Sequence, residues 1–337
     1  MSIHSRPIRW LHRHPLLGLL AALFLAAGAS VFIGRFPSPC WMPLRRLIED
    51  PLAQQLVLNL RLPRIVAAIL LGASLSGAGA VMQMLFRNPL VEPGFLGVSQ
   101  GAAFGAGLAI IFLGGSPLLL QGCAAGCAFL GLFISCTLAQ RLRYGGWILR
   151  LVLAGIAVSA LFSSGLGLLK CIADPLRQLP EITFWLMGGL WAVGWQDIAH
   201  MLPVVAPALF IVWLMRWRVS LLSLGDETAF SLGVAAGRER ILLLGAAVAA
   251  TAAVVAIAGV VGWIGLLVPH VARRLVGTDA RRSLPASMIL GGIFCLLCDD
   301  LARTLTSGEI PLGIFTALFG ATLFLMLMIR QPQGVRP

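Results

Sequence analysis

The sequence has few charged side chains, and almost all of its positive charge comes from one residue type. Charged residues make up 11% of the 337 residues, and Lys170 is the only lysine. A chain with so little charge and 59% hydrophobic residues does not have the polar surface of a water-soluble domain. The mean hydropathy of +0.94 instead indicates several membrane crossings, because each helical span takes about 20 apolar residues.

Several motifs that carry chemistry are also missing. The sequence has no G-x-x-x-x-G-K-[ST] loop and no H-E-x-x-H, so it does not hydrolyse ATP by the P-loop route. Cys295 and Cys298 have C-x-x-C spacing, but without a second pair or histidines at zinc spacing they are interpreted as apolar packing residues. His270 stands alone beside Pro269 and is interpreted as a structural residue at a helix break. We expect no catalytic residue, no metal site and no cofactor.

Long apolar runs, separated by short gaps that contain arginine, predict an all-α polytopic membrane protein with about ten transmembrane helices. A cleaved signal peptide is the alternative for the first run, because residues 28–30 are small, but the length of the run favours an anchor. Residues 34–60 are then expected to form an extended polar loop. The ten spans are predicted near residues 15–33, 62–86, 95–113, 117–138, 151–169, 198–214, 241–261, 262–275, 284–301 and 311–328.

The basic residues predict how these spans are oriented. With both termini in the cytoplasm, about two thirds of the basic residues lie inside, as the positive-inside rule expects. Spans two to five then begin outside and spans seven to ten begin inside, which predicts an inverted repeat of two four-helix units. The net charge of +12 therefore reports topology and does not indicate a nucleic-acid partner.

One polar interval interrupts the apolar pattern, and arginines on both sides of it place it in the cytoplasm. Its middle, residues 221–233, predicts one or two short helices, with Gly225 as a break, Asp226 as an N-cap and Gly233 as the stop. A helix of about two turns is not stable alone in water, so it must lie against something. We expect this loop to present a short helix to a separate cytoplasmic protein. The small apolar side of the helix is predicted to contain Ala229, Phe230 and Leu232.

The few charged residues near the outer ends of the spans are informative. Asp299 and Asp300 form the one acidic pair in a predicted span, and we expect them to neutralise Arg303 at i,i+3 and i,i+4 spacing rather than relay protons. Arg61, Arg64 and Arg303 lie at the outer mouth, where positive charge is disfavoured. Two interpretations stay open for these arginines: helix-end residues that reach the interface, or a basic rim that docks an acidic external partner.

Several stretches, in order along residues 55–330, resemble the permease subunits of type II ABC importers, which take up cobalamin, ferric siderophores or haem. They are LRLPR at 60–64, GAGAVMQMLFRNPLVEPGFLGVS at 77–99, FWLMGG at 184–189, LGDE at 224–227 with SLG at 231–233, GLLVPH at 265–270 and EIPLG at 309–313. Because these pieces occur together and at the family's spacing, the resemblance is specific.

The resemblance implies a fold of ten transmembrane helices and a homodimer with the transport pathway between its subunits. It also implies two copies of a cytoplasmic ATP-binding subunit and a periplasmic substrate-binding protein as partners. The chain would then be a multi-pass protein of the bacterial inner membrane, with cytoplasmic N- and C-termini. It would be a transport subunit and not an enzyme, because ATP is hydrolysed by the separate subunit.

The resemblance also implies roles for individual residues. Arg61, Arg64 and Arg303 match positions that receive acidic side chains of the binding protein. Asn88 and Leu90 match a cytoplasmic gate, and the partner segment of that gate falls just before span five, at Ile148 and Leu149. That segment is small and polar in some relatives and is bulky and apolar here. The coupling helix region, which sits in a cleft of the ATPase, comprises Leu224, Gly225, Asp226, Glu227, Ala229, Phe230, Leu232 and Gly233.

The expected function is therefore that of a permease subunit in an ATP-driven importer of a metal chelate. A ferric siderophore or haem is expected before cobalamin. A secondary transporter, which needs no ATPase partner, is the main alternative. A polytopic membrane enzyme is a weaker alternative, because no polar catalytic cluster is recognised. The methionines and cysteines do not indicate haem, since both are ordinary packing residues in lipid.

Overall fold

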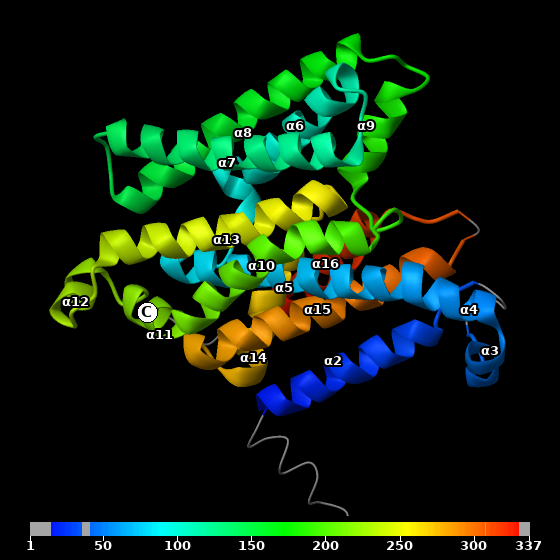
Figure 1. Cartoon of the computed structure of the whole chain (residues 1–337). Coiled ribbons are helices and arrows are strands. Elements are labelled where there is room, and N and C mark those ends of the chain that lie inside the picture. The colour runs from blue at the N-terminus through cyan, green and yellow to red at the C-terminus, as the bar shows by residue number, and fades with distance from the viewer. Residues whose placement is uncertain (1–14, 36–40, 307, 330–337) are drawn as a thin grey trace, which may run out of the picture.

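The computed structural model describes residues 15–35, 41–306 and 308–329, and in these ranges the chain folds into α-helices (Figure 1). Two short helices, α6 (Val98–Phe112) and α14 (Ile264–Val276), lie where the third and eighth spans are predicted. Eight further helical stretches are long and apolar enough to cross a membrane, which confirms the predicted fold class. These are α2 (Pro15–Phe32), Pro51–Leu85, which ends in α5 (Leu62–Leu85), α7 (Pro117–Arg141), α8 (Trp147–Ile172), α10 (Trp195–Leu214), α13 (Ala236–Ala258), α15 (Ala280–Thr304) and α16 (Leu312–Ile329).

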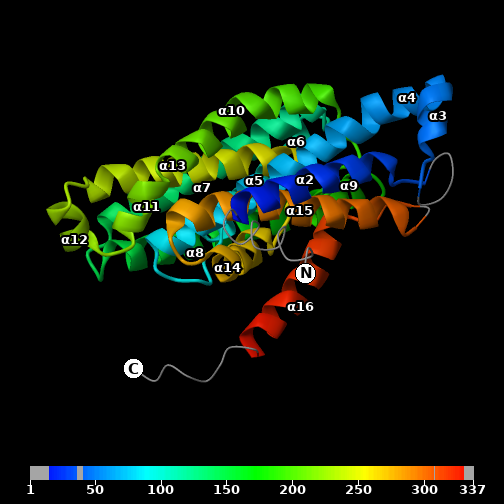
Figure 2. The same ribbon diagram turned by 90° about the horizontal axis from the view of Figure 1, so that it is seen from below.

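The helices form layers around a central pair, α5 and α13 (Figures 1 and 2). Helices α6, α7 and α8 pack together on one side of this pair, and α14, α15 and α16 pack together on the other. Helix α10 packs on both central helices, and α2 lies against α15. We name the two ends of the bundle after what they hold: the arginine end, with Arg61, Arg64 and Arg303, and the α12 end, with the short helix α12 (Asp226–Ser231).

The two halves of the bundle have matching contacts. Helix α5 packs on α14 and α15, and α13 packs correspondingly on α6 and α7. The pairs α6–α7, α6–α8 and α7–α8 have counterparts in α14–α15, α14–α16 and α15–α16. Helix α5 begins at the arginine end, whereas α13 begins at the α12 end, so the two units run in opposite directions. This arrangement is the one that an inverted repeat requires.

The two short helices begin in the same unusual way. Gly97 precedes α6 with φ 81°, and Trp263 precedes α14 with φ 72°, so both helices follow a left-handed residue. Each is entered from an irregular segment, the 3-10 helix η2 (Pro93–Leu96) in one half and residues 259–263 in the other. A Cβ atom added at Gly265, in the first turn of α14, would lie 2.8 Å from Cδ of Pro93 in η2, so the two breaks lie against each other. Irregular backbone at membrane depth is stable only where protein covers it in this way.

Small residues on α5 allow its neighbours to approach closely, as its sequence predicts. A Cβ atom added at Gly72 would overlap the carbonyl group of Gly291 on α15, and one added at Gly79 would overlap that of Gly265 on α14. Such backbone contacts give dispersion energy that lipid cannot replace. The position of α5 between α14 and α15 therefore depends on these glycines.

Two predictions about local structure are wrong. Residues 34–60 were predicted to be an extended loop, but they contain α3 (Leu44–Glu49), α4 (Pro51–Leu56) and the π-helix η1 (Val57–Arg61); residues 36–40 lie outside the described ranges. The signal for α4 is local: the Asp50 side chain accepts a hydrogen bond from the Leu52 N–H at 2.9 Å, and Pro51 occupies the first helical position.

The second error concerns Pro269, which was predicted to break a helix beside His270. The break lies instead at residues 259–263, and α14 continues through both residues. Proline deprives the carbonyl four residues earlier, that of Gly265, of its helical donor. The buried Gln83 side chain on α5 donates to this carbonyl at 3.2 Å and to that of Leu266 at 3.1 Å, which replaces the missing bond.

Candidate functional site

The α12 end carries the short helices predicted for the polar interval. Helix α11 (Arg216–Leu222) is followed by a turn at Gly225, which has φ 122°, and then by α12. Gly233, with φ 78°, ends α12 as predicted, and the bond from the Val234 N–H to the Ala229 carbonyl closes its last turn at 2.9 Å. The predicted N-cap is off by one residue, because Gly225 holds that position and Asp226 is the first helical residue.

The side chains of α12 divide between two faces. Phe230 is 79% exposed and Leu232 is 55% exposed, and Leu224 in the preceding turn is also exposed. Ala229 is completely buried, so the prediction that it shares one apolar side with Phe230 and Leu232 is wrong. The side chains of Asp226 and Glu227 lie outside the described part of the structure. The α12 end thus presents large apolar side chains that the described chain does not cover.

Helix α11 connects this surface to two long helices. Arg218 forms an ion pair with Glu239 at the start of α13, at 3.2 Å. Ser220 donates a hydrogen bond to Asp279, the N-cap of α15, at 3.2 Å. The Arg281 guanidinium lies over the Trp217 ring, 3.4 Å from the ring centroid. A displacement of α11 would therefore act on both α13 and α15.

The turn after α5 lies next to the same surface. A methyl group at Gly225 would lie 2.8 Å from Nη2 of Arg87, so the Arg87 side chain touches the turn between α11 and α12. Asn88 accepts a hydrogen bond from the Leu90 N–H through its side chain at 2.9 Å, and the Leu90 side chain is about half exposed. The predicted gate turn and the predicted coupling region are thus in direct contact through Arg87.

The second predicted gate segment also lies close to this turn. Residues 147–149 were placed before span five but form the first turn of α8, where Leu149 is about half exposed and Ile148 is partly buried. The rings of Phe86 and Trp147 lie 6.4 Å apart, which joins the end of α5 to the start of α8. The structure therefore brings the two gate segments together, while their gating role stays a prediction.

The arginine end holds its charge in a buried network. Arg64 donates to both carboxylate oxygens of Asp299, at 2.9 and 3.0 Å, and to both oxygens of Glu309, at 2.8 and 2.9 Å. Arg303 pairs with Asp300 and lies 4.0 Å from Asp299, which confirms the predicted neutralisation. Within the described chain, Asp299 is fully buried and Asp300 nearly so. A pair of carboxylates at this depth is stable because each one has a cationic partner.

The same network attaches α2 to the bundle. Arg303 donates to the Ser30 carbonyl and side chain at 2.7 Å, and Ser30 donates to Asp300 at 2.6 Å. Arg61 donates to the Val31 carbonyl at 2.7 Å. Arg61, Arg64 and Arg303 are each at most 9% exposed, so they do not form a free basic rim in this structure. Docking through them stays a prediction, and it requires an acidic partner to compete with internal acceptors.

Sequence reasoning did not identify which arginines at this end are exposed. Arg45, with its side chain 83% exposed, pairs with the exposed Glu49 at 2.8 Å, and Arg46 and Arg177 are also exposed. The positive-inside rule assigns a basic residue to one side of the membrane, but it does not say whether the side chain is buried or exposed there. Asp299, Asp300 and Glu309 are predicted near the same end of the spans as these arginines. Their presence could have indicated that some of the arginines are buried against carboxylates.

Other chemical signals do not build a reactive site. The interpretation that the sequence lacks a G-x-S-x-G motif is wrong, because residues 97–101 match this pattern. That motif, however, places its serine on a strand-to-helix turn. Here Ser99 lies in the first turn of α6, and no histidine is among the described residues that line the 260 Å³ cavity beside it. Cys295 and Cys298 are buried in α15, as expected for packing residues. Among the described residues, neither motif therefore assembles a reactive site.

Comparisons with known proteins agree with this geometry. The family model described as the FecCD transport family matches residues 19–330. The chain is 37% identical to the molybdate import system permease protein MolB of Haemophilus influenzae, over 95% of this chain and 96% of that protein. It is 40% identical to the hemin transport system permease protein HmuU of Yersinia pestis, over 82% and 84%. A solved inward-facing structure assigned to a metal-chelate type ABC transporter has a TM-score of 0.87 and 37% identity, covering 94% of this chain and 99% of that one.

Proposed function

The chain belongs to the FecCD transport family, and on that premise we propose that it is the permease subunit of an ATP-driven importer of a metal chelate. We favour a ferric siderophore or haem as the cargo, and cobalamin is less favoured. Its relatives include a permease named for molybdate import and one named for hemin transport, so members of the family are named for more than one cargo. The solved structure similar to this chain is described as a metal-chelate type transporter, and this supports a metal chelate as the proposed cargo.

The observation that carries this proposal is the exposed apolar surface of α12. Phe230 lies on α12, with Leu224 in the turn before it and Leu232 directly after it. Within the described chain this helix of six residues packs mainly on α11 and α13. A surface of this kind gains energy when a partner covers it, and a two-turn helix needs such support. We propose that two ATP-binding subunits cover the α12 surfaces of a homodimer. The α12 end is then cytoplasmic, and so are both termini of a multi-pass inner-membrane protein.

The contacts around α12 supply a physical route for coupling. When ATP draws the ATP-binding subunits together, α12 moves with them. Arg87 transmits this displacement to the turn at Asn88 and Leu90, and α11 transmits it to α13 and α15. Hydrolysis then resets the subunits. The energy available for transport is limited to the difference in contact energy between the two positions of α12.

The arginine end would then face the periplasm and receive the binding protein. The exposed Arg45, Arg46 and Arg177 offer positive charge for long-range attraction to an acidic partner. Arg61, Arg64 and Arg303 would contribute only if partner carboxylates replace internal ones, and Glu309 is the exposed candidate for replacement on Arg64 because it is 42% exposed.

The proposal is tested by reconstitution in proteoliposomes with the candidate ATP-binding subunit inside and the loaded binding protein outside. Uptake of an iron chelate should require ATP and the ATP-binding subunit, and it should persist when ion gradients are collapsed. A secondary transporter would show the opposite pattern, with uptake that follows an ion gradient and needs no nucleotide. That second outcome would reject the proposal.

A further inference from the structure

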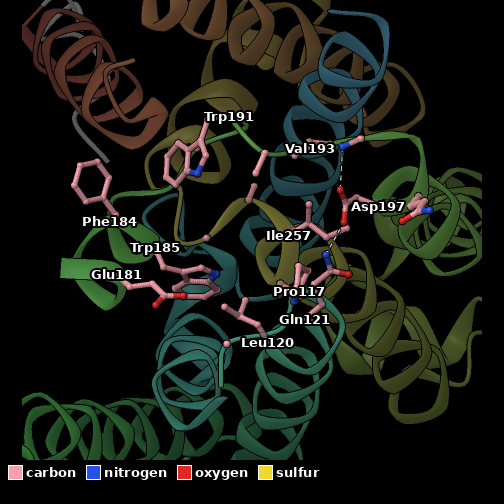
Figure 3. Close-up of a pocket in the computed structure, with 18 of the residues that line it drawn as sticks. Pro117, Leu120, Gln121, Glu181, Phe184, Trp185, Trp191, Val193, Asp197 and Ile257 are labelled. Atoms are coloured by element: carbon pink, nitrogen blue, oxygen red, sulfur yellow. Dashed lines mark hydrogen bonds between the residues drawn. The ribbon is translucent and has the colours of Figure 1, made fainter. Parts of the chain in front are cut away.

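A large cavity opens at the arginine end, beside the buried charge network, and Glu309 belongs to both. It measures about 840 Å³ and lies between α7, α9 (Gln178–Met187), α10 and the end of α13 (Figure 3). This volume is within the range of small-molecule sites, roughly 300–1,000 Å³. The coupling route described above does not use this cavity, and of the residues discussed for binding-protein docking only Glu309 lines it.

Aromatic side chains make up much of its wall. Phe184 and Trp185 come from α9, Trp191 comes from the segment before α10, and Trp195 is the first residue of α10. The Phe184 and Trp191 rings meet edge to face, with their centroids 6.2 Å apart. The indole nitrogen of Trp185 is buried and has no hydrogen-bond partner among the described residues. The cavity therefore offers aromatic ring faces to a bound molecule.

Its charge is negative in a chain whose net charge is +12. The carboxylates of Glu181, Asp197 and Glu309 line it, and none of its described lining residues is arginine, lysine or histidine. Glu309 is neutralised by Arg64. Asp197 accepts hydrogen bonds from the Gln121 amide at 2.7 Å and the Gly194 N–H at 2.9 Å, but within the described chain it has no cationic partner. Glu181 likewise forms no ion pair with a described residue.

These two carboxylates lie on opposite walls. Figure 3 shows Glu181 and Trp185 on one side of the cavity and Asp197 with Gln121 on the other. A molecule in the cavity would lie between two negative charges and against several ring faces. Anions are disfavoured there, because each uncompensated carboxylate repels them. Ring faces attract a cation, and organic ammonium groups are recognised by aromatic walls of this kind.

We infer that this cavity binds the ammonium group of an organic cation with an apolar body. Two sources of that chemistry exist, an amine-bearing cargo delivered at the arginine end and the ethanolamine headgroup of a membrane lipid. The binding site itself does not depend on the proposed function. The assignment of the cation to cargo does rest on it, and would narrow the cargo to chelates that carry an amine.

The test uses the full chain in nanodiscs of phosphatidylglycerol, whose headgroup has no ammonium. Choline is the probe, and dimethylbutanol is its uncharged isostere. Because three of the nine tryptophans line the cavity, saturable changes in tryptophan fluorescence, checked by calorimetry, report binding. Choline should bind about tenfold more tightly than dimethylbutanol, since the isostere loses the cation–ring and carboxylate attraction. Glu181→Gln should weaken choline binding several-fold, whereas Glu49→Gln, which removes an exposed carboxylate outside the cavity, should not.

A second set of nanodiscs with phosphatidylethanolamine separates the two sources. Weaker apparent choline binding there would identify the lipid headgroup as the occupant, and unchanged binding would favour an amine-bearing cargo. The inference is overturned if choline does not bind saturably, if dimethylbutanol binds as tightly as choline, or if Glu181→Gln has no effect. No ATP-binding subunit takes part, so failure here is distinct from failure of the proposed function.

Discussion

The two ends of the bundle differ in which side chains they bury: one end buries charged side chains, and the other exposes apolar ones. At the arginine end, Arg64 and Arg303 are buried against Asp299 and Asp300. At the α12 end, Phe230 is exposed on a helix of six residues. The buried ion pairs and hydrogen bonds at the arginine end fix α2, α5 and α15 relative to one another. The exposed apolar side chain at the α12 end can instead be buried by a partner. An end with few internal contacts opens at low cost, which suits a part that moves.

The largest effect is expected from breaking the buried network. Asp299→Asn leaves the Arg64 guanidinium without its fully buried counter-charge, which should cost about 3–5 kcal/mol of folding free energy. Thermal unfolding of the purified protein in detergent would show a large drop in Tm and a low yield of monodisperse protein.

Glu49→Gln is the matched control for this change. It removes a carboxylate that also pairs with an arginine at 2.8 Å, but this pair is exposed, so the cost should be about 0–1 kcal/mol. Equal stability of the two variants would show that the arginine end does not fix the bundle geometry.

A smaller effect on stability, but a specific effect on transport, is expected at Gly225. Gly225→Ala forces a Cβ into a backbone conformation with φ 122° and places it 2.8 Å from Arg87, at a cost of about 1–3 kcal/mol. Because the strain is confined to the turn between α11 and α12, reconstituted uptake should fall by about tenfold, whereas Tm should drop less than in Asp299→Asn.

The control for Gly225→Ala is Gly237→Ala, in the first turn of α13, where a Cβ meets nothing within 4 Å. This variant should transport normally. If Gly225→Ala also transports normally, the contact between Arg87 and the α11–α12 turn does not carry coupling.

The structure differs from the sequence-based predictions mainly where distant residues interact. Apolar length and arginine spacing predicted the spans, because each depends on one local segment. The role of Gln83 in supporting Pro269 could not be predicted, since its side chain donates to the Gly265 carbonyl, 182 positions away in the sequence. The burial of Arg61, Arg64 and Arg303 was missed for the same reason: their acceptors are Val31, Asp299, Glu309, Ser30 and Asp300.

The short helices show the same limit at a smaller scale. Gly233 marks the end of α12 in the sequence, because a left-handed residue there is a local property. The inward direction of Ala229 depends on how α12 sits on α11 and α13, and periodicity over six residues does not define it. The cavity at the arginine end could not be predicted either, because its aromatic and acidic residues come from four separate segments.

The smallest effect on stability and binding should come from removing one of the two carboxylates that pair with Arg64. Glu309→Gln removes the exposed carboxylate that competes with an acidic partner, and should cost about 0–1 kcal/mol in stability. Docking of the binding protein should tighten several-fold at low salt, and the gain should shrink as salt screens the charges. Glu49→Gln makes the same charge change at this end. Identical docking of the two variants at every salt concentration would show that Arg64 takes no part.

The most direct measurement compares how two variants bind the ATP-binding subunit. Phe230→Asp places a charge on the exposed surface of α12, and Tyr144→Asp makes a similar change at a side chain of nearly equal exposure, 77% against 79%, on the loop between α7 and α8. Phe230→Asp should weaken binding by about 100-fold, in the range of a lost hot-spot residue, whereas Tyr144→Asp should bind normally. Normal binding and normal nucleotide-dependent uptake by Phe230→Asp would contradict the assignment of α12 as the surface through which ATP drives transport.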